Sequence, residues 1–166
     1  MADVHKIIDK FREMMSNEVY SEPDTPLHQN LINQIVPSLV KNPDGPKVGE
    51  KMVDIGCGSG YMLDKFVEAG YNKSDMTGVT MGEVDLATVK EKGYEGYPYD
   101  MTFTDFANES FDFGIVRHCL EHSAWPYLTL MEFNRILKMG GRMYIEMPAP
   151  GGCLLYTSDA ADEVDG

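Results

Sequence analysis

The sequence predicts an α/β fold, a three-layer α/β/α sandwich built on a mostly parallel sheet. Short apolar runs alternate with helix-like stretches across residues 51–147, and such alternation is typical of βαβ units with right-handed crossovers. The chain has 166 residues, of which 43% are hydrophobic, so it is long enough for one domain with its own core. A glycine-rich turn follows the first apolar run, at the end of the sheet where ligands bind in open α/β folds.

Two helices are expected ahead of the first strand. Apolar residues recur at helical spacing over residues 3–16. Thr25 is expected to cap a second helix that has Pro26 at its first position and ends near Leu39. A turn-rich connector over residues 42–49 then leads into the sheet.

The remaining elements are expected to alternate, with a polar loop in place of a helix between the third and fourth strands. The expected strands are 51–55, 76–80, 95–99, 111–116 and 142–147. The expected helices are 60–69, 83–92 and 126–139, the last of them stopped by Gly140 and Gly141.

Composition narrows the class of protein. The net charge of −13 repels phosphate backbones, so nucleic acid is not expected as a partner. No segment has the pattern of a secretory signal or the length of a bilayer span, so membrane insertion is not expected. Cys57, Cys119 and Cys153 show neither paired nor metal-type spacing, which favours a reducing, cytoplasmic setting without a metal.

Residues 54–60 follow the pattern D-x-G-x-G-x-G, with Asp54 placed before Gly56, Gly58 and Gly60. Glycines let the backbone bend sharply and approach a ligand, and the helix that follows offers free N–H groups. Dinucleotide loops instead read G-x-G-x-x-G, with their acid about 20 residues downstream. A tight turn with a purely structural role is the alternative for this motif alone.

This arrangement resembles the first motif of class I S-adenosylmethionine-dependent methyltransferases. Residues 110–122 are similar to the SFD…HxLEH segment of the type-11 methyltransferases, and residues 132–142 to their E-x-x-R-x-L-K-P-G-G stretch, with Met139 in place of proline. The resemblance covers roughly residues 45–150 and implies a Rossmann-like sheet of seven strands, of which this chain supplies the first five.

The resemblance implies that the glycine loop holds the methionine and ribose parts of S-adenosylmethionine. The implied loop contacts are Gly56, Cys57, Gly58 and Gly60. Asp54 is implied to act on the methionine ammonium, directly or through water. Arg117 and His118 fall where family members touch the methionine end of the cofactor.

The ribose position departs from the family pattern. Thr80 stands where most class I methyltransferases have an acid that accepts both ribose hydroxyls, and Met81 follows it. Glu83 or Asp85 is expected to supply the missing carboxylate. The alternative for each is an acid favoured at a helix start by the macrodipole.

The adenine position is implied by spacing. Asp100 and Met101 precede the fourth expected strand at the family distance, so the Asp100 carboxylate is expected to accept the adenine amino group and the next N–H to meet the ring. The alternative is that Asp100 only forms a turn.

Methyl transfer is an in-line displacement in which positioning is the main source of rate. His118 is the candidate general base, because histidine titrates near physiological pH, and Glu121 is its tentative companion. The alternatives are a packing or cofactor-binding role for His118 and a helix-capping role for Glu121.

The predicted function is transfer of a methyl group from S-adenosylmethionine to a small-molecule or lipid-like acceptor. The alternative is a non-catalytic nucleotide- or cofactor-binding module, degenerate or inactivated by truncation. A nicotinamide dehydrogenase is a weaker third possibility, because the sequence lacks both G-x-G-x-x-G and an acid at the end of the second strand.

Three parts of the chain are expected. Residues 1–44 would cap the cofactor and acceptor site, residues 45–152 would form an incomplete methyltransferase core, and residues 153–166 would be a non-native tail. Residues 153–163 resemble a translated sequencing adapter, a contaminant of metagenomic assemblies, with a natural acidic tail as the alternative. A truncation near Gly152 would leave the fifth strand as an edge and favour dimerisation or aggregation.

Overall fold

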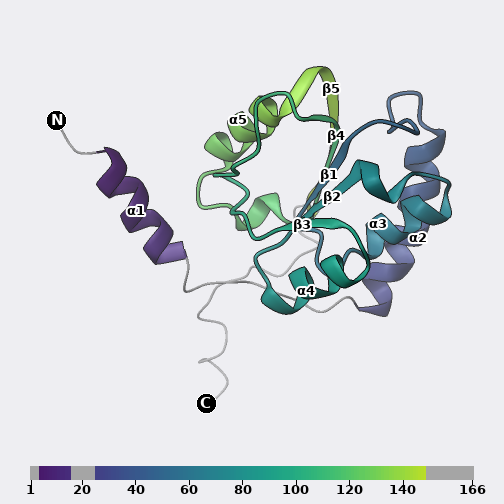
Figure 1. Ribbon diagram of the computed structural model, residues 1–166, viewed down its shortest axis with the longest axis horizontal. Helices are drawn as coiled ribbons and strands as arrows, with labels where there is room; N and C mark the ends of the chain where they lie inside the picture. Colours follow the sequence, from purple (N-terminus) through teal and green to yellow (C-terminus); the bar gives the residue numbers. More distant parts are fainter. Residues whose placement is uncertain (1–3, 16–24, 149–166) are drawn as a thin grey trace, which may run out of the picture.

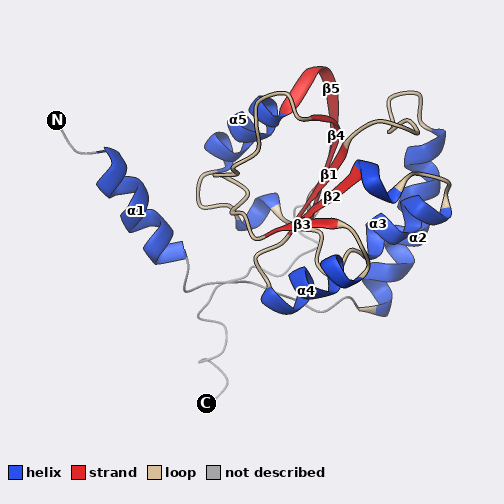
Figure 2. Cartoon of the chain, in the orientation of Figure 1, coloured by secondary structure: helices blue, strands red, loops and turns tan. Residues whose placement is uncertain are grey.

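The computed structural model describes residues 4–15 and 25–148, and within them a five-stranded parallel sheet forms the core (Figures 1 and 2). The strand order is β3-β2-β1-β4-β5. The strands are β1 (Met52–Ile55), β2 (Met76–Val79), β3 (Glu95–Tyr97), β4 (Phe111–Arg117) and β5 (Leu137–Glu146). All neighbouring pairs are parallel, which confirms the predicted fold class.

Helices cover both faces of the sheet and give three layers (Figure 2). On one face, α2 (Pro26–Lys41), α3 (Tyr61–Glu68) and α4 (Glu83–Glu91) bury an apolar cluster against Met52, Met76 and Phe113. On the other face, α5 (Pro126–Ile136) packs against a second cluster. That cluster contains Val53, Ile55, Val79, Phe111, Val116, Leu120, Phe133 and Ile136. Because alternate residues of β1 belong to the two clusters, the strand is buried along its whole length.

The N-terminal helices form where the sequence predicts them. Helix α1 spans Val4–Met15. In α2 the Thr25 side chain accepts the N–H of His28 at 3.3 Å, and Pro26 occupies the first turn, so the predicted cap is confirmed. Ile32, Val36 and Leu39 of α2 belong to the core cluster beside α3, so α2 packs as part of a layer.

The prediction for the last helix and strand is wrong at their junction. Helix α5 ends at Ile136, three residues before Met139, and β5 begins at Leu137 rather than at Arg142. The physical reason is pairing, because Leu137 aligns with Phe111 of β4 before the register shifts to the Phe113–Arg142 pair. Gly140, with φ +77°, lies in the extra length that this shift accommodates and does not end a helix.

The link between β3 and β4 contains no helix. Its regular structure is one antiparallel bridge between Asp100 and Phe103. An aromatic cluster fills the space beside it, with Tyr97 stacked on Tyr99 and the Phe106 ring edge-on to both. This link, which contains the predicted site residue Asp100, therefore depends on side-chain contacts for its shape.

Two predictions lie beyond these observations. The adapter-like segment 153–163 is outside the described residues. Among the described strands β5 lies at the sheet edge, and its use in dimerisation stays a prediction. Within residues 4–15 and 25–148, no helix combines the length and apolar character that crossing a membrane requires.

Gly78 of β2 packs closely against Cys57, which follows β1, and this packing can be tested by substitution. A Cβ at this position would lie 2.8 Å from Cys57 Sγ and 3.2 Å from Val89 Cγ1. We expect Gly78→Ala to lower the free energy of unfolding by about 1–3 kcal/mol through overpacking, measured by urea denaturation. Adding Cys57→Ala removes the nearer obstacle, so the double variant should lose less than the sum of the two single losses. Strictly additive losses would contradict this explanation.

Candidate functional site

A glycine loop, residues 56–60, connects β1 to α3 at the carboxyl end of the sheet. Gly56, Gly58 and Gly60 have φ values of 78°, 50° and 79°, a left-handed region that favours glycine. The N–H groups of Gly56 and Cys57 both donate to the Val79 carbonyl, at 2.9 and 3.0 Å. The loop is thereby fastened to the end of β2.

Gly56 has a second requirement that comes from packing. A Cβ on it would lie 2.6 Å from the Sγ of Cys119, in the segment that leaves β4. The first glycine of the motif therefore lets two strand exits touch. The same closeness brings residues from β1 and β4 to one place.

Cys119 lies near enough to three of the predicted acids for their charges to act on its thiol. Burial, followed by the negative charges of Asp54, Glu121 and Asp100, raises the pKa of its thiol to about 12. Its Sγ lies 3.8 Å from the sulfur of Met101. The structure thus brings together four site residues predicted from separate parts of the sequence.

The β2 exit carries the predicted ribose residues. Thr80 is buried, with 8% of its surface exposed, and its N–H donates to the Tyr97 carbonyl at 3.1 Å. Met81, the next residue, is exposed. Thr80 therefore joins β2 to β3 through its backbone, and the next turn lies open to solvent.

The two candidate acids of α4 differ in what they face. Glu83 is exposed on the first turn of the helix. Asp85 is half-buried and acts on the glycine loop, because burial, then the charges of Asp54 and Asp85, raise the pKa of the Cys57 thiol well above its usual value. Asp85 is therefore the acid of this helix whose charge acts on the glycine loop.

Asp100 forms the turn that its alternative interpretation predicts. Its Oδ1 accepts the N–H of Thr102 at 2.7 Å, and its carbonyl accepts the N–H of Phe103 at 3.1 Å. Because a carboxylate accepts through two oxygens, this turn is compatible with a further acceptor role.

His118 leaves β4 in a strained backbone conformation, with φ +48°. Its N–H donates to the Glu146 carbonyl at 2.9 Å, and its Nε2 lies 2.9 Å from the Glu146 carboxylate. Its Nδ1 lies 3.9 Å from Glu121 Oε1. Strained residues at strand ends are characteristic of functional sites.

Glu146, at the end of β5, is the centre of this cluster. It accepts the Tyr144 hydroxyl at 2.7 Å and the Arg117 Nε–H at 3.3 Å. Burial opposes its ionisation, but the hydrogen bond from Tyr144, the charge of Arg117 and the contact with His118 outweigh burial and lower its pKa. Glu146 is therefore an anion that orients groups of both β4 and β5.

Two buried polar atoms bear on what this cluster could bind. Arg117 Nη2 and Glu121 Oε2 are inaccessible to water and make no hydrogen bond with the described residues. Such atoms cost free energy unless a partner is supplied. One is a donor and the other an acceptor, so a ligand that carries both an anion and a cation, as an amino acid does, would satisfy them. The described residues contain no group of three or more side chains suited to a metal ion.

Sequence analysis missed Cys119, Tyr144 and Glu146. A carboxylate between the apolar Ile145 and Met147 was an available signal for Glu146. The alternation of β5 pointed to burial but not to a polar cluster. For Cys119 the sequence holds no signal, because its importance comes from contact with Gly56.

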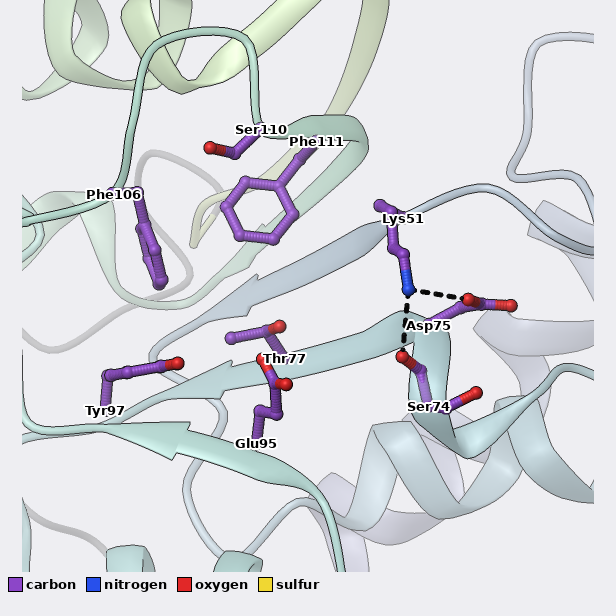
Figure 3. A pocket seen from close by; sticks show the side chains of 9 residues that line it. All are labelled: Lys51, Ser74, Asp75, Thr77, Glu95, Tyr97, Phe106, Ser110 and Phe111. Atoms are coloured by element: carbon purple, nitrogen blue, oxygen red, sulfur yellow. Dashed lines mark hydrogen bonds and ion pairs between the residues drawn. The ribbon is translucent and has the colours of Figure 1, made fainter.

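A pocket of about 310 Å³ lies away from these residues, near the amino ends of the strands (Figure 3). Lys51 there donates to Asp75 at 2.9 Å and to the Ser74 carbonyl at 3.1 Å, and Phe106 and Phe111 lie on the other side. None of the predicted site residues lines it. The carboxyl end is therefore the better candidate site, because strained backbone and unsatisfied buried atoms coincide there.

Comparison with known proteins gives matches to methyltransferases. Residues 53–145 match the family described as "Methyltransferase domain". Ubiquinone biosynthesis O-methyltransferase of Aeromonas salmonicida is 30% identical over 127 residues, which cover 72% of this chain and 51% of that protein. The corresponding protein of Pseudomonas aeruginosa is 31% identical over 104 residues, with 58% and 44% covered. The chain thus spans about half the length of these curated relatives.

Solved structures show the same fold. The PH0226 protein of Pyrococcus horikoshii superposes with a TM-score of 0.62 at 22% identity, with 76% of this chain and 61% of that chain covered. A structure from Thermotoga maritima, described as a SAM-dependent methyltransferase and possible histamine N-methyltransferase, gives 0.56 at 20% identity, with 83% and 56% covered.

The lowered pKa of Glu146 predicts a pH dependence of stability. A carboxyl whose folded pKa lies below its ordinary value of 4.5 stabilises the fold above that value and loses this contribution as pH falls through the folded pKa. We expect Glu146→Gln to cost about 1 kcal/mol or more at pH 7 and progressively less below about pH 4.5, measured by urea unfolding.

Glu91→Gln, at an exposed position of α4, is the matched control and should change stability little at any pH. A loss for Glu146→Gln that stays constant from pH 7 to pH 3 would contradict the assignment.

Proposed function

Because this chain belongs to the family of methyltransferase domains, we propose that it is the cofactor-binding part of an S-adenosylmethionine-dependent methyltransferase that acts on a small molecule. The observation that carries the proposal is the gathering of Asp54, Asp100 and Glu121 around Cys119, beside a glycine loop with left-handed backbone. In a parallel sheet this is the edge where a nucleoside-containing ligand binds.

The methionine end suits the buried atoms that lack partners. Arg117 Nη2 matches the ligand carboxylate, and Glu121 Oε2 matches a cationic donor such as the ammonium. Asp54, 3% exposed beneath the glycine loop, adds negative charge to the same region. Glu121 thereby gains a cofactor-binding role beside the catalytic one predicted from sequence.

The nucleoside end is assigned to the exits of β2 and β3. Asp85 is favoured over Glu83 for the ribose hydroxyls because its charge acts on the glycine loop, with Thr80 and Met81 at the neighbouring turn. Asp100 is assigned to the adenine amino group, and the Met101 backbone to the ring.

The bound cofactor supplies an electrophilic methyl group on a sulfonium. The chain holds the reactants in line and excludes water, and this positioning lowers the activation barrier by several kcal/mol. His118 is placed to accept a proton from a hydroxyl acceptor at Nδ1, because its Nε2–H donates to Glu146. Glu146 fixes the orientation of the ring through this hydrogen bond.

The acceptor is assigned to a class only. The curated relatives are named as O-methyltransferases of ubiquinone biosynthesis, which supports an oxygen nucleophile on a small, lipid-like molecule. The net charge of −13 argues against nucleic acid, and three cysteines without paired spacing fit a cytoplasmic protein. Residues 1–44 remain our candidate for the part that shapes the acceptor pocket.

Binding of the cofactor is the direct test. We expect S-adenosylhomocysteine to bind with a micromolar dissociation constant, about −8 kcal/mol, in isothermal titration. Asp54→Ala and Gly58→Val should each abolish most of this binding. The first removes charge beneath the loop, and the second places a branched side chain at φ +50°.

NADH is the control ligand and should not bind. Tighter binding of NADH than of S-adenosylhomocysteine would overturn the proposal. Binding of S-adenosylhomocysteine without transfer to any hydroxyl-bearing acceptor would instead favour a cofactor-binding module.

A second test concerns the adenine assignment. If the Asp100 carboxylate accepts the adenine amino hydrogen, Asp100→Ala should cost about 1–3 kcal/mol of affinity for S-adenosylhomocysteine. The inosine analogue of the ligand lacks that amino group, so wild type and variant should bind it with similar affinity in the same titration. Equal losses for both ligands would show that Asp100 only forms the turn.

A further inference from the structure

The link between β3 and β4, residues 98–110, carries the residues assigned to adenine. Its one antiparallel bridge joins Asp100 to Phe103, and it contains no helix. Backbone groups outside regular structure need other partners when they are buried. The shape of this link therefore has to come from elsewhere in the fold.

Helix α5 supplies those partners from three residues on one face, which we call the stripe. Thr129, Glu132 and Arg135 follow one another at a spacing of three residues and so share a helix face. The Thr129 hydroxyl is 2.8 Å from that of Thr102, and both residues are buried, with 0% and 7% of their surface exposed.

The next two members of the stripe hold the next part of the link. Glu132 Oε1 accepts both the N–H of Thr104, at 2.9 Å, and its hydroxyl, at 2.5 Å. Arg135 donates to the Phe106 carbonyl at 2.7 Å and to the Thr104 carbonyl at 3.2 Å. Successive stripe residues thus contact alternate residues of the link.

The stripe is internally braced. Arg135 makes two bonds of 2.7 Å to the Glu132 carboxylate, one to each oxygen. Burial opposes ionisation of Glu132, but the bonds from Arg135 and Thr104 outweigh it and lower its pKa. Thr129 also lies 2.6 Å from the Ser123 hydroxyl, which ties the stripe to the segment that follows Glu121.

We propose that Thr129, Glu132 and Arg135 are positioning residues that set the affinity for the adenine part of the cofactor by holding Asp100 in place, without touching the ligand themselves. The inference rests on the proposed function for the identity of the ligand. It assigns to the E-x-x-R pair of the sequence a role in shaping the cofactor site.

A double-mutant cycle distinguishes this role from a contribution to stability alone. We would measure binding of S-adenosylhomocysteine by titration for the wild-type chain, Asp100→Ala, Glu132→Gln and the double variant. Glu132→Gln should weaken binding about tenfold in the wild-type background and less than about threefold when Asp100 is already Ala. Glu91→Gln, on α4, is the matched control and should leave affinity unchanged.

The hydrogen bonds between the α5 stripe and the link can be measured without ligand. The Thr104 N–H donates a hydrogen bond to the Glu132 carboxylate. In Glu132→Gln the hydrogen-exchange rate of this amide should rise, while the amides of the central strand β1 keep their wild-type rates. If Glu132→Gln fails to fold, Thr104→Val removes the hydroxyl bond and keeps the amide bond, and should weaken binding by a smaller factor.

The outcomes separate the two proposals. Equal weakening by Glu132→Gln in both backgrounds, or faster exchange at Thr104 with unchanged affinity, overturns the positioning role and leaves the proposed function intact. No binding of S-adenosylhomocysteine to the wild-type chain overturns both. A smaller loss in the Asp100→Ala background, together with faster exchange at Thr104, supports the inference.

Discussion

The site depends on one carbonyl that accepts two hydrogen bonds. Val79 ends β2, and its oxygen receives the N–H groups of Gly56 and Cys57 as the chain leaves β1. Gly56 has a left-handed backbone at this contact, and its lack of a Cβ lets Cys119 approach. The ends of β1 and β2 and the exit of β4 are thereby held within contact distance, and everything proposed for the cofactor follows from that closeness.

The carboxylates placed around this point need compensation, because burial penalises charge. Glu146 is balanced by Arg117, Tyr144 and His118, and Glu132 by Arg135 and Thr104. Both acids keep a lowered pKa, so the hydrogen bonds and opposite charges outweigh burial. The acids near Cys119 instead act on a thiol that stays protonated. In the site that we propose, the first group of carboxylates holds the structure, and the second is assigned to the ligand.

Local patterns predicted most elements well, since capping residues, glycine stops and apolar periodicity act within a few residues. The failure at the junction of α5 and β5 has a clear cause. Leu137 continues the apolar pattern of the helix, but it pairs with Phe111 across the sheet. Helical propensity is worth a few tenths of a kcal/mol per residue, so ladder hydrogen bonds and burial at a strand edge decide the outcome.

The alternation of strands and helices, the glycine turn after β1 and the acids at the strand exits can be predicted from the sequence, because periodicity, turn chemistry and spacing are local properties of the chain. Three relations appear only in the folded molecule: Asp85 rather than Glu83 acts on the glycine loop, Glu146 orients His118, and α5 holds the link after β3. These relations join residues separated by up to 31 positions, such as Arg135 and Thr104. They arise from the packing of layers, which no local pattern encodes.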